Sequence, residues 1–166
     1  MRIPGLFQTE DHTRALFDLF VPALPRLEVE LRIAHRLARH AVVASDPGVP
    51  YVGLIHEAAL RLRMGGRRVA KAQLSRLLEE SERPNVSLLV IPFAAEGFPM
   101  AGDTMMYVAA ASPHLDTAEV DSPIGAVFFD SPTQLANFRR RLDLVEQVAL
   151  NPSESRDLIL EIADEL

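Results

Sequence analysis

The chain has 166 residues, 48% of them hydrophobic and 24% charged, with a formal net charge of −6 and no cysteine. This composition predicts one cytoplasmic globular domain over residues 1–166, and it excludes disulfide frameworks, thiolate metal sites and cysteine nucleophiles. The negative charge argues against broad nucleic-acid binding, and the lack of a long apolar run argues against a membrane span or an export signal.

Two helices are predicted in the first quarter of the chain. Thr9 can cap the first helix, and Pro22 ends it. The second helix covers about residues 25–43 and has the clearest apolar stripe, with a spacing of three and four residues. This stripe, which we expect to lie in the core, consists of Leu24, Leu27, Leu31, Ala34, Ala38 and Ala41.

The next segment mixes a strand with helices. Residues 51–55 are predicted to form a short buried strand that runs into a helix over residues 57–64. Gly65 and Gly66 stop that helix, and a further helix is expected over residues 69–82. These elements complete a helical part that we assign to residues 9–82.

From residue 86 the pattern is typical of strands. Residues 86–91 are nearly all apolar, which predicts a strand covered on both faces. Short turns separate further strands at about 104–111, 115–121 and 126–130, so we expect a mostly antiparallel four-stranded meander over residues 86–130. Ser131 and Asn151 then begin two closing helices over residues 131–166, which we expect to pack on the sheet. The predicted fold class is α+β.

Several short motifs along the chain recur in a known order and spacing. The motifs lie at residues 3–16, 57–61, 73–77, 83–86, 90–93 and 149–155. Together they resemble the C-terminal region of actinobacterial helix-turn-helix transcription regulators of the Xre type, which are toxin–antitoxin-like. The resemblance covers nearly the whole chain, but no DNA-reading helices precede the first motif.

This resemblance implies a sensing or partner-binding domain rather than an enzyme. The expected partner is a small molecule or a small protein, with no cofactor and no direct nucleic-acid contact, and a homodimer is an alternative assembly. A stand-alone member of such a family could instead be a cofactor-free cyclase or isomerase in natural-product biosynthesis. The catalytic candidates for that alternative are His12, His56, Glu57, Tyr107 and Glu119.

Two segments are candidates for a ligand site. The first helix begins with polar residues that can either cap it or form one wall of a pocket. The loop at residues 94–102 carries glycines and apolar side chains, a composition that suits a lid, although methionines there also suit core filling. The candidate ligand-binding residues are Gln8, Thr9, Glu10, Arg14, Phe93, Phe98, Met100, Met105 and Tyr107.

Metal binding is not expected. His56 and Glu57 begin like the zinc-protease pattern HExxH, but Leu60 stands where the second histidine is required. Glu57 is more typical of a residue that stabilises the positive end of a helix. Glu119 lies on a predicted strand, where it is either exposed to solvent or, if a helix covers that face, requires a cationic partner.

Overall fold

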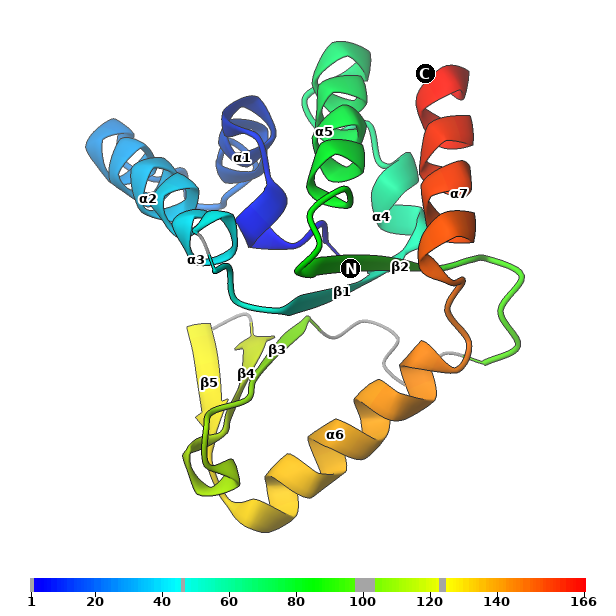
Figure 1. The fold of residues 1–166 in the computed structure, drawn as a ribbon. Coiled ribbons are helices and arrows are strands. Elements are labelled where there is room, and N and C mark those ends of the chain that lie inside the picture. Colours follow the sequence, from blue (N-terminus) through cyan, green and yellow to red (C-terminus); the bar gives the residue numbers. More distant parts are fainter. Residues whose placement is uncertain (1, 46, 98–103, 123–124) are drawn as a thin grey trace.

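The computed structural model describes residues 2–45, 47–97, 104–122 and 125–166. These residues form an α+β fold with two small sheets, each covered by helices (Figure 1). The α+β class is therefore confirmed.

The N-terminal part begins with a 3₁₀ turn, η1 (Gly5–Phe7), and the helices α1 (Glu10–Phe17), α2 (Arg26–Ala38) and α3 (Ala41–Ala44). Strand β1 (Tyr51–His56) follows, then α4 (Glu57–Arg61), α5 (Arg67–Glu80) and strand β2 (Val86–Ile91). Gly66 has a φ of 87° just before α5, a conformation that side-chain-bearing residues rarely adopt.

The first sheet consists of β1 and β2, which run parallel, with Tyr51 opposite Val86 and His56 opposite Ile91. Helices α1, α4, α5 and α7 (Pro152–Glu165) lie on one side of this sheet (Figure 1). The main core lies between the sheet and these helices. Its fully buried members include Phe7, Ile55, Leu74, Leu77, Leu88 and Ile159.

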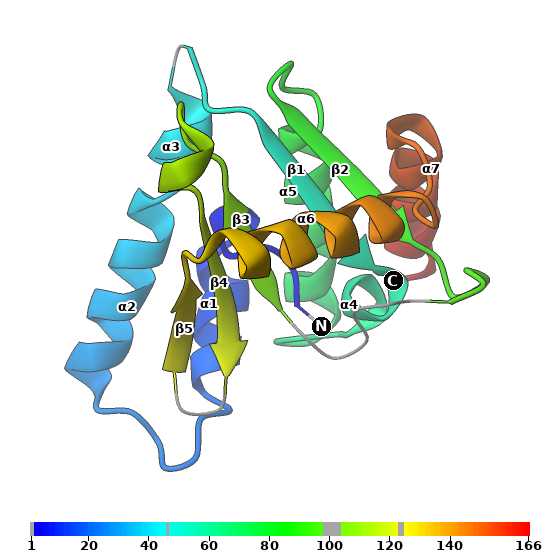
Figure 2. The ribbon, with the colours of Figure 1, turned by 90° about the horizontal axis from the view of Figure 1, so that it is seen from below.

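The second sheet is an antiparallel meander in the order β3 (Met105–Val108), β4 (Thr117–Ser122) and β5 (Gly125–Phe129). A second 3₁₀ turn, η2 (Pro113–Leu115), joins β3 to β4, and α6 (Pro132–Glu146) packs on one face of the sheet. The ring of Phe129 on β5 lies 5.1 Å from that of Phe138 on α6. Figure 2 shows α6 passing beneath both sheets.

The predicted four-stranded meander is only partly correct. Residues 86–91 do form a strand with both faces covered, but this strand pairs in parallel with β1 and not with β3. The meander therefore has three strands, over residues 105–129. Likewise only α6 packs on the meander, whereas α7 packs on β2 and α5.

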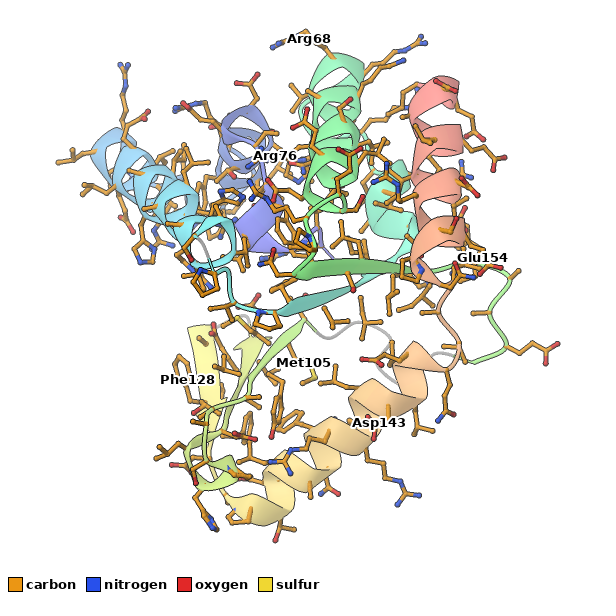
Figure 3. All side chains as sticks on the ribbon, viewed as in Figure 1. Arg68, Arg76, Met105, Phe128, Asp143 and Glu154 are labelled. Carbon is orange, nitrogen blue, oxygen red and sulfur yellow. The ribbon has the colours of Figure 1, made fainter. Side chains whose placement is uncertain are left out.

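A small apolar cluster joins the two parts of the fold. Met105 at the start of β3 packs with Ile91 of β2 and Val145 of α6 (Figure 3). The outer edge of β2 is also occupied, because the Val90 N–H donates to Ser155 Oγ (2.8 Å) and the Val90 carbonyl accepts from the Leu150 N–H (2.8 Å). These contacts fix the connection between α6 and α7 against β2.

The predicted burial of the stripe on α2 is wrong. Leu27 and Leu31 are 72% and 62% exposed, and Ala34 and Ala38 are also exposed. The opposite face of the helix, which includes the buried Ile33, packs against the rest of the protein. In Figure 1, α2 stands at the outer end of the row of helices.

Candidate functional site

The start of the chain is held against α5 by buried hydrogen bonds. Gln73 Nε2 donates to the Phe7 carbonyl (2.8 Å), and Gln73 Oε1 accepts from the Thr9 N–H (2.8 Å). Thr9 Oγ1 in turn accepts from the His12 N–H, which caps α1 as the sequence predicts. These contacts fix the position of α1 and therefore the direction of the His12 side chain.

Gln8 connects the same segment to α2. Its Nε2 donates to the Ile3 carbonyl (2.7 Å), and its Oε1 accepts from Arg36 Nη1 (2.7 Å). The Arg36 guanidinium also lies over the Phe17 ring, 5.0 Å from the centroid. Arg36 is thus held in one place without a carboxylate partner among the described ion pairs.

Beside these residues the surface is hollowed. The hollow has a volume of about 290 Å³ and lies between the end of α1 with the residues that follow it, the last turn of α2 and the segment that precedes α5. A second hollow of about 20 Å³, roughly the space of one water molecule, adjoins it and shares Arg2, Leu16 and Met64 as walls. We call the two together the N-terminal hollow. The larger part is also lined by Phe17, Leu19, Phe20 and Arg36. The smaller part is also lined by Ile3, His12, Ala59 and Leu62.

His12 is the unusual group of this hollow. Its side chain is 5% exposed, and its Nδ1 is buried without a hydrogen-bond partner among the described residues. Burial, and then the charge of Arg36, lower the pKa of His12 from 6.5 to about 4, so the imidazole is neutral at pH 7. A buried polar atom without a partner is costly, and this one borders the space in which a ligand atom would fit.

The larger part of the hollow has excess positive charge. Burial lowers the pKa of Arg36, and the charges of Arg39, Arg2 and Arg32 lower it further, whereas Asp121 acts in the opposite direction. A bound anion would relieve this repulsion, and apolar walls would accommodate a hydrocarbon group. The arrangement is suited to a small carboxylate that carries an alkyl or aryl group.

The ligand-binding residues predicted at the start of α1 do not line the hollow, and their side chains are already engaged. Gln8 and Thr9 make the contacts described above. Arg14 is bonded to Glu10 (2.9 Å) and to Glu30 (2.6 Å) in an exposed ion-pair network. Of this segment, the residue that lines the hollow is His12, which was predicted as a catalytic candidate and as one of the polar residues that either cap the helix or form a pocket wall.

The predicted loop site cannot be described as a whole, because Phe98 and Met100 lie outside the described residues. Phe93 is exposed, and its ring stands edge-on to His56 at 5.5 Å. Met105 packs in the small cluster beneath β2. Neither lines the N-terminal hollow.

Tyr107 belongs to a separate polar cluster. Its hydroxyl donates to Asp116 Oδ2 (2.6 Å), which also accepts from Arg139 Nη2 (2.6 Å). Hydrogen bonds from the Ala110 N–H, Tyr107 and Arg139 lower the pKa of Asp116 to about 2. The cluster ties η2 to α6.

The remaining catalytic candidates occupy different places. His56 Nδ1 accepts from the Ala58 N–H (3.2 Å) and caps α4. Glu57 accepts from the Phe93 N–H (2.8 Å) and from Arg61 Nε (2.6 Å); burial raises its pKa, but these bonds lower it overall. Glu119 is half-buried on the face of β4 turned away from α6, opposite to the face of Tyr107.

Of the residues that line the hollow, His12 alone was among the predicted candidates, and the two arginines, Arg2 and Arg36, were not. The signal available in the sequence is the position of Arg36, three residues after the buried Ile33 and thus on the same side of the helix.

Within the described part of the chain, no group of three or more His, Asp or Glu side chains is placed to hold a metal ion. Among the same residues, no helix has the length and apolar character needed to cross a membrane.

Comparison with known proteins gives one match. Residues 1–161 match a family described as a domain of unknown function, DUF5753. No curated protein and no solved structure matches the chain.

Proposed function

The chain belongs to the DUF5753 family, and we propose that it is the sensing domain of a bacterial transcription regulator, which binds a small carboxylate in the N-terminal hollow. The main support for this proposal is the buried Nδ1 of His12, which has no hydrogen-bond partner among the described residues and lies in the same hollow as Arg2 and Arg36. The resemblance to the C-terminal region of actinobacterial Xre-type regulators supports the cytoplasmic regulatory setting.

The expected ligand follows from the walls. The Arg36 and Arg2 guanidiniums would bind the carboxylate, and Phe17, Phe20 and Leu16 would contact its hydrocarbon part. The volume of about 290 Å³ lies at the small end of ligand sites, so the ligand is a compact one.

The test compares acids with neutral molecules of the same shape. Octanoate and phenylacetate are expected to bind, as measured by calorimetry, whereas octanamide and phenylacetamide bind at least about 10-fold more weakly because they lack the charge that pairs with Arg36. Replacing Arg36 with methionine is expected to weaken binding of the acids by about 30- to 100-fold.

The matched control is Arg32→Met on the same helix. Arg32 is paired with Glu28 at the surface and does not line the hollow. The N-terminal hollow would be ruled out as a carboxylate site if acids and amides bound with equal affinity. It would also be ruled out if Arg36→Met and Arg32→Met lost equal affinity for the acids. Native mass spectrometry of gently purified protein adds a second readout, in which a retained small-molecule adduct is expected for the unmodified chain and not for Arg36→Met.

A further inference from the structure

The exposed stripe of α2 is an apolar feature that the fold does not use. Within the helix it consists of Leu27, Leu31, Ala34 and Ala38, all exposed. They lie on the side opposite to Ile33 and Arg36, through which the helix contacts the rest of the protein. Packing within one chain therefore gives no reason for two exposed leucines on this face.

The stripe has an internal symmetry. Its members are separated by four, three and four residues, so the spacing is the same when the helix is read in reverse. If two copies of α2 lie antiparallel, Leu27 faces Ala38 of the second copy and Leu31 faces its Ala34. Each large side chain then meets a small one, the arrangement that fills space most evenly between two helices.

The pattern continues beyond the ends of the helix. Leu24 precedes Leu27 by three residues, and Ala41 follows Ala38 by three. Leu24 is half-buried and precedes the helix, and Ala41 belongs to α3, so the stripe of α2 itself is the centre of the pattern. Within α2, two leucines of one copy face two alanines of the other across a two-fold axis between Leu31 and Ala34.

The flanking charges favour the same direction. Glu28 lies beside the stripe near its start, and His35 and Arg39 lie on the same side near its end. An antiparallel pair brings the Glu28 carboxylate of one copy close to the basic residues of the other. In a parallel pair the flanks that carry Glu28 would lie on opposite sides of the two-fold axis, so Glu28 would not face the basic residues of the other copy.

We propose that α2 is a homodimer interface, in which two copies of this chain pack the stripe 27–31–34–38 antiparallel across a two-fold axis. The interface is independent of the proposed ligand site, because the N-terminal hollow faces the other side of α2. A stripe of two leucines and two alanines buries little surface, and small interfaces bind weakly, so a dissociation constant in the micromolar range is expected.

The first test measures the oligomeric state by sedimentation velocity from about 1 µM to about 500 µM. The unmodified chain is expected to change from monomer to dimer in this range. Leu31→Glu places two charges in the centre of the interface and is expected to weaken dimerisation at least 100-fold. The control Leu160→Glu, at an exposed position of α7 far from α2 in Figure 1, should leave it unchanged.

The second test determines the direction of packing. The chain has no cysteine, so Leu27→Cys and Ala38→Cys each provide one reactive thiol. A bis-maleimide that spans about 8–10 Å should cross-link a mixture of the two variants and neither variant alone, because equivalent positions are about 16 Å apart along the axis of an antiparallel pair. A monomer at every concentration, an unaffected Leu31→Glu dimer, or cross-linking of Leu27→Cys with itself would each overturn the proposal.

Discussion

Replacing Glu80 with glutamine is expected to lower the free energy of unfolding by about 3 kcal/mol at pH 7. The Glu80 side chain is 1% exposed and is surrounded by Arg76 Nη2 at 2.6 Å, Arg83 Nε at 2.8 Å and His40 Nε2 at 2.9 Å. A neutral amide leaves these groups facing one another without the carboxylate that holds them. Because His40 lies between α2 and α3, the loss also loosens the attachment of α2 to α5.

The effect of Glu80 should depend on pH. Burial raises the pKa of Glu80, but the hydrogen bond with His40 and the charge of Arg76 lower it overall, below the ordinary value of 4.5. A carboxylate whose pKa is lower in the folded chain stabilises the fold above pH 4.5, and this stabilisation is lost as the pH falls through the folded-state pKa. The difference between the two proteins should therefore be largest near pH 7 and shrink in acid.

Glu79→Gln is the matched control. Glu79 is the neighbouring residue and also pairs with Arg76 (3.6 Å), but its side chain is 68% exposed. Exposed pairs contribute little, so a loss below about 0.5 kcal/mol is expected. Urea unfolding of both variants at several pH values measures the change in the free energy of unfolding. If both variants lost the same amount, the contacts of Glu80 would stabilise the fold no more than a surface ion pair does.

Local signals in the sequence predicted the helix boundaries well. Thr9, Ser131 and Asn151 each cap a helix through their side chains, and Asn151 forms a capping box with Glu154. These contacts involve residues three positions apart, so they can be recognised without knowledge of the tertiary structure.

Strand pairing was harder to predict because it depends on residues far apart in sequence. The apolar run from Val86 to Ile91 correctly indicated a strand covered on both faces. Its partner, β1, begins 35 residues earlier at Tyr51, and the intervening helices α4 and α5 make the parallel crossover. The nearest strand in sequence, β3, was instead assumed to be the neighbour.

The error on α2 has a different origin. An apolar stripe indicates a buried face, but the pattern does not distinguish the core of one chain from an interface between two. In α2 the longer apolar side chains face solvent, while Arg36 on the opposite side enters the N-terminal hollow. For the same reason the arginines of the candidate site could not be recognised from residue spacing alone.

Replacing His12 with leucine is expected to make the protein more stable, and increasingly so in acid. At pH 7 the gain is about 1 kcal/mol, because the buried Nδ1 that has no partner among the described residues is removed and an apolar side chain takes its place. The pKa of His12 falls from 6.5 to about 4 on folding, through burial and the charge of Arg36. Above pH 6.5 the His12 imidazole is neutral in both the folded and the unfolded chain, so the pKa difference contributes nothing to the free energy of unfolding.

Between pH 6.5 and about 4 the unfolded chain binds a proton at His12 and the folded chain does not, so the unmodified protein loses stability as the pH falls. The pKa difference corresponds to at most about 3.4 kcal/mol, and screening by water in the hollow reduces the expected loss to about 2 kcal/mol. His12→Leu should not show this loss, whereas His114→Leu, at an exposed position of η2, should retain it.

The same variant connects stability to function. His12 borders the small part of the N-terminal hollow, which adjoins the larger part, and a side chain there that costs the fold free energy is expected to be retained for binding. His12→Leu should therefore bind octanoate at least about 10-fold more weakly while it unfolds at a higher urea concentration. If the variant is instead less stable at pH 5 than the unmodified chain and binds octanoate equally well, His12 is an ordinary core residue and the site lies elsewhere.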